Sequence, residues 1–487
     1  MTLQKKLLSG LFWVLLLNVL IKPFWILGIE VGVQNAVGLE TYGFYITLFN
    51  LAYIFNILLD IGVTNFNTRN IAQHPQLIGK HLSGILSIKL LLLAFYVVVT
   101  FTVALLLGYT SRQFYLLAFL SFNQFLNSLI LYLRSNYEGL LLFKWDSVIS
   151  ILDRVIMIVI CGCLLWLPRH PEFQIECFVY AQSVAYLVTA LVAFGVLVRK
   201  TGWRRLHLSR PFTIAILKQS APFALLVLLM ASYNRIDPLL LQQISIDGNY
   251  QAGVYASAFR LLDALTMIAY LVSVPLLPIF SKLTQHHKDR KENEQEQLAS
   301  TVKMVSSLML VFSITAAITC SGMSDWLMEL LYKENTAASS NVFKVLIYGI
   351  IPISLTYVFG TLLTAAGKLK QLNLLACGTL IINVVVNLLC IPRWGAEGSA
   401  WASLTAQSFM ALAQVVIAMK TFRLKISLRY ILKIILFTLI IGCCFIPTLE
   451  TWWLRLVVVG VVGTVFALLL NLIDLNEIKN ILNEKER

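Results

Sequence analysis

Apolar runs of about 20 residues recur along the whole chain and constrain its fold more than any other feature. A helix of about 20 residues crosses the hydrocarbon core of a bilayer, whereas membrane β-barrels show alternating segments of about 10 residues. With 59% hydrophobic residues and a mean hydropathy of +0.80, the 487-residue chain carries more apolar surface than a soluble fold can bury. We therefore expect an all-α, polytopic membrane protein.

The apolar windows predict about fourteen spans, arranged as two lobes of six helices followed by two more. The first lobe, residues 1–198, holds windows at 11–29, 43–63, 83–108, 114–136, 148–167 and 177–198. A basic cytoplasmic linker, residues 199–213, leads to a second lobe, residues 214–419, with windows at 214–241, 252–280, 301–322, 342–366, 372–391 and 396–419. Residues 420–487 add spans at 430–447 and 452–473 and a cytoplasmic tail. Residues 325–332 are too short to span, and we expect a surface-lying helix there.

Basic residues fall in alternate loops and set the predicted orientation. The loops assigned to the outer side hold Arg112, Arg169, Lys333 and Arg393, whereas 23 lysines and arginines fall in the opposite loops and tail. This asymmetry satisfies the positive-inside rule and puts both termini in the cytoplasm. The formal charge of +14 is thus mainly a topology signal, with attraction to anionic membrane lipid as a secondary effect, and it does not indicate nucleic acid.

A short sequence echo suggests that the two lobes are related. Gly43-Phe44-Tyr45 opens the second predicted span, and Gly253-Val254-Tyr255 opens the eighth, its equivalent in the second lobe. Repeated lobes would place a substrate site between them near the bilayer midplane. The alternative is that glycine and aromatic residues are simply common where spans begin.

The eight cysteines lie within or at the ends of spans, and none has metal-ligand spacing with histidine. We expect them to pack as small apolar side chains, with no metal site, no disulfide framework and no bound cofactor.

Charged residues interrupt the apolar spans between positions 221 and 263. They are Arg235, Asp237, Arg260 and Asp263. A charge at membrane depth is costly unless it meets a partner or a water-filled cavity, so each is a functional candidate.

Several motifs, in this order along nearly the whole chain, resemble the Wzx-type polysaccharide flippases of the multidrug/oligosaccharidyl-lipid/polysaccharide exporter (MOP) superfamily. They are D-I-G-V-T-N-F-N-T-R-N-I-A (60–72), N-R-I-D (234–237), A-G-V-Y-A-S-A-F-R-L (252–261), A-A-G-K-L-K-Q-L-N-L-L (365–375) and N-V-V-V-N-L-L-C-I-P-R-W-G-A-E-G-S-A-W-A-S (383–403). Each motif alone is weak, and their order together is more specific.

The resemblance implies a bacterial inner-membrane protein with two six-helix lobes around a central cavity and two trailing helices. Such a protein would move an undecaprenyl-diphosphate-linked oligosaccharide outward by alternating access, for O-antigen, capsule or exopolysaccharide synthesis. The implied partners are the lipid-linked substrate, membrane lipid and other polysaccharide-assembly membrane proteins, and we expect a monomer.

A diphosphate crossing the low-dielectric core needs cations at cavity depth, and arginine suits phosphate oxygens because it stays charged and binds them in a fork. We expect Lys22, Arg235 and Arg260 to bind substrate. Lys22, next to Pro23, lies roughly 17 Å into the first span at a rise of 1.5 Å per residue. The alternatives are that Lys22 pairs with an acid on a neighbouring helix, that Arg260 pairs with Asp263, and that Arg235 and Asp237 pair or reach the interface.

Four further residues are candidates for gating or ion coupling: Asp60, Arg69, Asp237 and Asp263. Asp60 and Arg69 flank the cytoplasmic end of the second span, as an inner gate or as a structural cap. Coupling to H⁺ or Na⁺ would need a carboxylate such as Asp60, Asp237 or Asp263. For Lys89, Arg134, Asp153, Arg154 and Lys218, near the cytoplasmic face, we expect snorkelling or pairing instead.

Two other functions remain as alternatives. A multidrug cation antiporter of the same superfamily would favour an acidic cavity, which the surplus of cations within the spans argues against. A membrane polysaccharide polymerase or glycosyltransferase generally needs a substantial outer loop with catalytic acids, and no paired-carboxylate or nucleotide-binding motif stands out. We therefore expect a transporter and not an enzyme.

Overall fold

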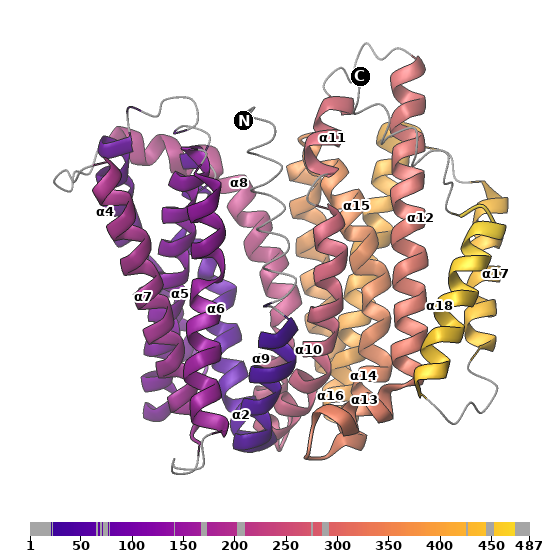
Figure 1. Cartoon of the computed structure of the whole chain (residues 1–487), viewed down its shortest axis with the longest axis horizontal. Coiled ribbons are helices and arrows are strands. Elements are labelled where there is room, and N and C mark those ends of the chain that lie inside the picture. Colours follow the sequence, from indigo (N-terminus) through magenta and orange to yellow (C-terminus); the bar gives the residue numbers. More distant parts are fainter. Residues whose placement is uncertain are drawn as a thin grey trace. The chain divides into compact units, whose positions relative to one another are not determined.

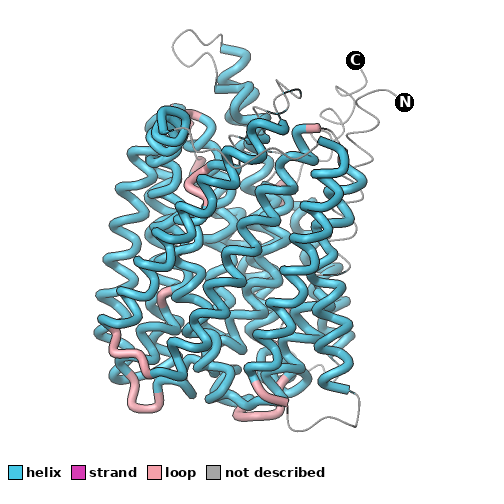
Figure 2. The backbone as a smooth tube through the Cα atoms, turned by 90° about the vertical axis from the view of Figure 1, so that its left-hand side faces the viewer, coloured by secondary structure: helices cyan, strands magenta, loops and turns pink. Residues whose placement is uncertain are grey.

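The structure is a computed structural model that describes residues 21, 23–64, 67–68, 71, 76, 78–140, 142–166, 173–201, 210–273, 276–284, 292–424, 427–444 and 452–472. Every regular element in these ranges is a helix, which confirms the all-α prediction. Figure 2 shows that the described chain is built of long helices and short loops. The chain is a multi-pass membrane protein.

The helices follow the predicted spans closely. Up to the end of α10 they are η1 (Trp25–Glu30), α2 (Val31–Ile54), η2 (Phe55–Leu59), α4 (Ile78–Leu106), α5 (Ser111–Gly139), α6 (Phe143–Trp166), α7 (Ile175–Thr201), α8 (Arg210–Arg235), α9 (Asp237–Ile244) and α10 (Gly248–Ser273). After it come α11 (Leu276–Thr284), α12 (Glu292–Gly322), α13 (Ser324–Leu331), α14 (Thr336–Leu346), η4 (Ile347–Gly349), α15 (Ile350–Ala365), α16 (Leu369–Phe422), α17 (Leu428–Cys443) and α18 (Trp452–Leu469). The short helix expected at 325–332 is α13.

Ten helices in the described part of the chain are long and apolar enough to cross a membrane. Two of them are divided at glycines with non-helical backbone angles, Gly38 (φ 81°) within 25–59 and Gly395 (φ 53°) within α16. The helix α16 contains two whole predicted spans, whereas 25–59 contains most of the second predicted span and only the described end of the first. The pair Phe223–Arg235 and Asp237–Ile244, bent by 49°, is one broken span, and α17, at 16 residues, corresponds to the predicted span at 430–447. With these divisions the described helices correspond to the predicted spans, apart from the first, most of which lies outside the described residues.

The chain divides into two compact units. The first comprises residues 1–256 with 331–334, and the second comprises 257–330 with 335–487. The division falls within α10. The lobe and linker boundaries expected from the sequence stay a prediction.

The first unit is built around α5 and α7, which pack along each other, with α2 and α6 against them (Figure 1). Fully buried tyrosines tie neighbouring helices through their hydroxyls. The hydroxyl of Tyr96 donates to the Ala52 carbonyl at 2.9 Å, and that of Tyr137 donates to the Ala193 carbonyl at 2.5 Å. In a lipid environment such hydrogen bonds hold helices together because helix association gains little from the hydrophobic effect.

In the second unit, α15 packs against α16 and α12. The last two helices, α17 and α18, pack on each other and on α12 (Figure 1). Their contact buries Phe437, Ile441 and Val459 around Ile314 of α12. The two C-terminal spans are therefore anchored by apolar packing to one helix of this unit.

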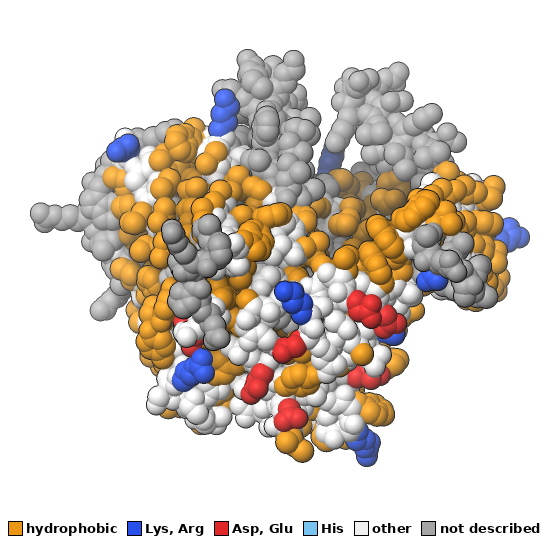
Figure 3. Space-filling model, turned by 60° about the horizontal axis from the view of Figure 1, so that its bottom comes forward, with side chains coloured by type: hydrophobic (Ala, Val, Ile, Leu, Met, Phe, Trp, Pro, Cys, Tyr) orange, Lys and Arg blue, Asp and Glu red, His pale blue; other side chains and the backbone are white. Residues whose placement is uncertain are grey.

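Charged side chains gather at a helix end. Figure 3 views the end at the bottom of Figure 1, where acidic and basic side chains lie among uncharged polar atoms. Along the helices, large apolar side chains such as Leu105, Leu106 and Leu439 are more than half exposed, as in a protein surrounded by lipid.

Candidate functional site

A buried ion pair occupies one end of the first unit. The Lys89 ammonium of α4 lies 2.5 Å from an oxygen of Asp60, and the Lys89 side chain is fully buried while that of Asp60 is 22% exposed. Lys89 also donates to the hydroxyl and carbonyl of Ser128 on α5, at 2.8 and 3.4 Å. All three ammonium protons thus have acceptors, which a buried charge requires.

Asp60 is placed by a break in the helix. After η2, Ile61 and Gly62 take positive φ values of 41° and 78°, which end the helical run. The Thr64 hydroxyl, which follows this break in the chain, donates a hydrogen bond of 2.5 Å to a carboxylate oxygen of Asp60, which precedes it. A positive φ is sterically unfavourable for a β-branched residue such as Ile61, so the surrounding contacts must stabilise this backbone conformation.

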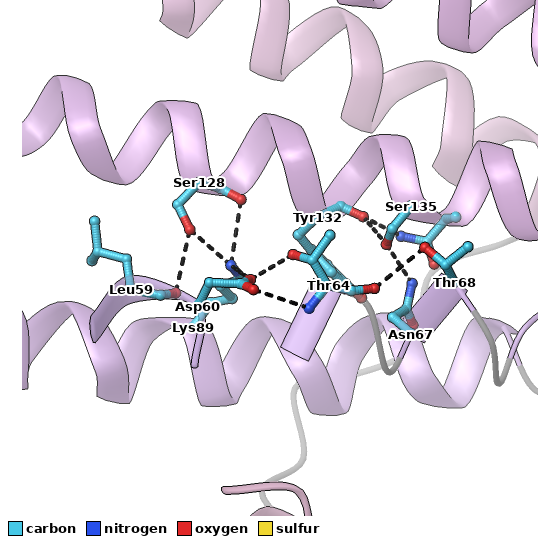
Figure 4. Close-up of polar contacts among 10 residues, drawn as sticks. Leu59, Asp60, Thr64, Asn67, Thr68, Lys89, Ser128, Tyr132 and Ser135 are labelled. Carbon is cyan, nitrogen blue, oxygen red and sulfur yellow. Dashed lines mark hydrogen bonds and ion pairs between the residues drawn. The ribbon is translucent and has the colours of Figure 1, made fainter. Parts of the chain in front are cut away.

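The motif that begins at Asp60 lies along α5 (Figure 4). Asn67 donates to the Ser135 hydroxyl at 2.8 Å, and the Thr68 hydroxyl lies 3.4 Å from a carboxylate oxygen of Glu138. Asn67 and Thr68 follow the break at Ile61 and Gly62, whereas Asp60 precedes it. Asn67 and Thr68 of this motif therefore contact α5, whereas Arg69 lies outside the described residues.

The broken span places two opposite charges at two helix ends. Arg235 ends α8 and Asp237 begins α9, with only Ile236 between them. A cation is favoured at a helix C-terminus and an anion at an N-terminus. The Arg235 guanidinium also lies 5.4 Å from the ring centre of Tyr53, and the fully buried Asp237 accepts a 2.7 Å hydrogen bond from the Tyr255 hydroxyl.

The two glycines of the sequence echo lie at one crossing of α2 and α10. A methyl group built on Gly43 would lie 2.6 Å from the Gly253 nitrogen, and one on Gly253 would collide with the Leu39 carbonyl. Glycine is required at both positions because the backbones themselves are in contact. The echoed tyrosines are buried beside this crossing, and Tyr45 accepts a hydrogen bond from Gln182 at 3.0 Å.

Residues 331–334, the α13–α14 connection, bind the turn at Gly38; we call them the strap. A Glu334 oxygen accepts from the backbone nitrogen of Leu39 at 2.7 Å, where the helix restarts after Gly38. Asn35 donates to the Leu331 carbonyl at 2.7 Å and accepts from the Lys333 nitrogen at 3.1 Å. The strap is thus held by side chains that satisfy helix-end backbone groups.

The remaining predicted residues are placed as follows. Arg260 and Asp263 lie on α10 in the second unit, are partly buried, and each has an interaction partner. Lys22 lies outside the described residues. Of the seven candidates, Arg235 and Asp237 lie next to each other and Asp60 pairs with Lys89. The roles of all seven in binding, gating or coupling stay predictions.

Of the four cations that the sequence places near the cytoplasmic face, three lie beside an acid and the fourth, Lys218, is exposed. Besides Lys89, Arg134 donates to Asp146 at 2.7 Å and Arg154 lies 3.6 Å from Asp153. In contrast, Glu334 and Asn35 carried no signal in the sequence, because their partners are backbone groups almost 300 residues away. Among the described residues, no group of three or more His, Cys, Asp or Glu side chains is arranged to hold a metal ion.

Known proteins similar to this chain share its fold. A structure described as the lipid II flippase MurJ in an inward closed conformation matches 93% of this chain and 98% of its own, with a TM-score of 0.64 and 15% identity. The inward-facing conformation of a multidrug resistance MATE family transporter of the MOP superfamily covers 82% of this chain and 94% of its own, with a TM-score of 0.64 and 12% identity. At these identities the likeness shows the fold alone.

Sequence comparisons are more specific. An uncharacterized membrane protein of Methanocaldococcus jannaschii is 23% identical over 293 residues, covering 57% of this chain, and the chain spans 65% of that protein's length. The family model described as polysaccharide biosynthesis protein matches residues 7–284, and the one described as lipid II flippase MurJ matches residues 150–471. Each covers more than half of the chain, and together they show that the protein belongs to the family of polysaccharide biosynthesis proteins and MurJ-like lipid II flippases.

Proposed function

We propose that this protein is a flippase that moves an undecaprenyl-diphosphate-linked oligosaccharide across the bacterial inner membrane for surface polysaccharide synthesis. The observation that carries the proposal is the pair of matching family models, one for polysaccharide biosynthesis and one for a lipid II flippase, which overlap across the middle of the chain. One description names polysaccharide synthesis and the other names a flippase for lipid II. The drug transporters share the fold, but fold likeness does not select a substrate.

Charge chemistry supports the same substrate class. A diphosphate entering the membrane interior needs cations there, because an unpaired anion in a low dielectric is prohibitively unstable. Lys22, Arg235 and Arg260 are the proposed ligands of that diphosphate. Arg235 stands at the break between α8 and α9, the kind of discontinuous span at which transporters often bind their substrates.

Transport by alternating access requires a source of energy or an exchange partner. We propose coupling to H⁺ or Na⁺ through Asp60, Asp237 or Asp263, with Asp60 and Arg69 contributing to an inner gate. In this proposal the protein is not an enzyme, works as a monomer beside other polysaccharide-assembly membrane proteins, and has both termini in the cytoplasm.

A deletion strain tests the proposal directly. Its lipid extract is expected to accumulate the undecaprenyl-diphosphate oligosaccharide, and vesicles of known orientation are expected to keep it inaccessible to a glycan-modifying reagent outside. Surface glycan should be lost and then restored by the intact gene. Complete repeat units that reach the outer leaflet but stay unpolymerised would favour the polymerase alternative, and an unchanged lipid pool would favour drug export.

A further inference from the structure

An open pocket of about 600 Å³ lies in the first unit, beside the turn at Gly38. It is lined by residues on both sides of that turn, by the start of α5, and by the start of α7 with the two residues before it: Ala36, Val37, Thr41, Arg112, Phe173, Gln174, Ile175 and Glu176. The volume is within the range of pockets that hold small molecules. None of the seven candidate residues discussed above lines it.

The two charged groups of the pocket hold each other in place. Arg112 donates to the same Glu176 oxygen through two nitrogens, at 2.8 and 3.3 Å, and its guanidinium lies 5.3 Å from the ring centre of Phe44. The Arg112 side chain is nevertheless 65% exposed, so part of its fork still faces water. The pair supplies fixed donors and acceptors with a combined charge near zero.

The other lining groups extend the same chemistry. Thr41 and Gln174 add a hydroxyl and an exposed amide, each of which can donate and accept. Phe173 and Val37 add apolar surface next to them. A ligand that satisfies this lining needs many groups that both donate and accept, arranged on a compact body with apolar faces.

We propose that this pocket binds a neutral saccharide, with the Arg112–Glu176 pair, Gln174 and Thr41 meeting its hydroxyls. A phosphate fits less well because Glu176 neutralises the arginine and would repel an anion. Arg112 belongs to the loops that the sequence assigns to the outer side, where a translocated sugar would emerge. This inference rests on the proposed function, and it assigns the sugar part of the substrate a docking site apart from the cationic ligands of the diphosphate.

The full-length protein in lipid nanodiscs tests the site without any transport step. The probe is the saccharide released by mild acid from the lipid extract of the deletion strain, labelled with a fluorophore and followed by anisotropy. Two variants change the pocket and leave the ion pair intact: Gln174→Ala removes an exposed amide, and Ala36→Trp fills space at an exposed position. Arg112→Gln removes the charge, and Arg393→Gln, an exposed arginine outside the pocket, is the matched control.

We expect each of the three pocket variants to weaken saccharide binding about tenfold, which is the effect of losing one charged or well-placed hydrogen bond. The control variant should bind like the native protein. Equal binding by all variants would overturn the site, and so would a native protein that binds neither the released nor the lipid-linked saccharide. Displacement of the probe by inorganic pyrophosphate would overturn its assignment to a neutral sugar. Binding of only the intact lipid-linked saccharide, with the same loss in Ala36→Trp, supports the site and identifies the lipid-linked form as its ligand. Flipping of the lipid by the native protein, measured in parallel, decides the proposed function separately.

Discussion

Gly43 on α2 and Gly253 on α10 stand 210 positions apart in the chain and share one backbone-to-backbone crossing. A methyl group on Gly43 would lie 2.6 Å from the Gly253 nitrogen, a separation that real side chains do not adopt. The glycines of the short repeats at 43–45 and 253–255 are therefore explained by the contact that Gly43 and Gly253 make with each other. Whether the short repeats also reflect a repeat of the lobes stays a prediction.

Gly253→Ala is expected to destabilise the protein, because the added carbon can be accommodated only by moving the backbone of α2. Overpacking of this kind typically costs about 1–3 kcal/mol. The thermal unfolding midpoint of the purified protein should fall. Gly195→Ala on α7 is the control, since a methyl group there meets nothing within 4 Å, and alanine is the better helix former by about 0.5–1 kcal/mol. Equal midpoints for the two variants would contradict the close crossing.

Lys89→Met is expected to be strongly destabilising because it leaves Asp60 without its buried partner. Breaking one side of a buried pair costs about 3–5 kcal/mol, and the partial exposure of Asp60 should bring the effect toward the lower end. The double variant Asp60→Asn/Lys89→Met should recover part of the loss, and unfolding of the four proteins gives the coupling energy. Additive losses would show that the pair does not act as a unit. Lys370→Met, at an exposed position, controls for the change of side chain.

Glu334→Ala is expected to loosen the strap, because the Leu39 nitrogen then loses its acceptor at a helix start. A lost cap costs about 1 kcal/mol, which corresponds to roughly fivefold faster hydrogen exchange at the turn. Exchange measured by mass spectrometry on peptides covering residues 33–42 provides the readout. Glu329→Ala, an exposed acid on α13, should leave that exchange unchanged. Unaltered exchange in Glu334→Ala would show that water replaces the carboxylate without cost.

The pH dependence of one exposed contact can be predicted in sign. Hydrogen bonds from the Ser340 hydroxyl, and then from Lys344, lower the pKa of Asp325 on α13. A carboxyl whose pKa is lower in the folded state contributes stability above its unfolded pKa of about 4 and loses it as the pH falls through the folded value. The side chain is 67% exposed, so the contribution should stay below about 1 kcal/mol.

The small stability difference between native protein and Asp325→Asn is therefore expected to be present at pH 7 and to vanish as the pH falls below about 4. Unfolding midpoints measured across this range check it. A difference that persists at low pH would mean that the contact does not depend on the carboxylate charge.

Export should fail in Arg260→Ala and in Lys22→Ala, with each protein still present in the membrane at its normal level. The physical reason is the loss of a cation that the proposed diphosphate needs at membrane depth. Surface glycan and immunoblots report export and protein level, and Lys370→Ala serves as an exposed control. Normal export by both variants would remove the cationic-site mechanism while leaving the family assignment intact.

Much of the fold was determined by the sequence alone, because the signals that define membrane spans are local. About 20 apolar residues in a row predict a spanning helix wherever they occur, so the fourteen windows match the helices, apart from the first, most of which lies outside the described residues. The ordered motifs likewise indicated the flippase family, since motifs are read along the chain. The charges Arg235 and Asp237 were visible within an apolar run, but the sequence did not show that the span breaks between them and bends by 49°.

The tertiary structure decided which residues meet. Asp60 has Lys89 as its partner, 29 residues on, Asn35 and Leu39 bind a strap nearly 300 residues away, and the two echoed glycines bring two helices into contact. The pocket at Arg112 is assembled from three segments that no single window of sequence contains. Hydropathy predicts which segments cross the lipid. Which side chains form hydrogen bonds and ion pairs depends on the distances and directions between helices, and these are set only when the chain folds.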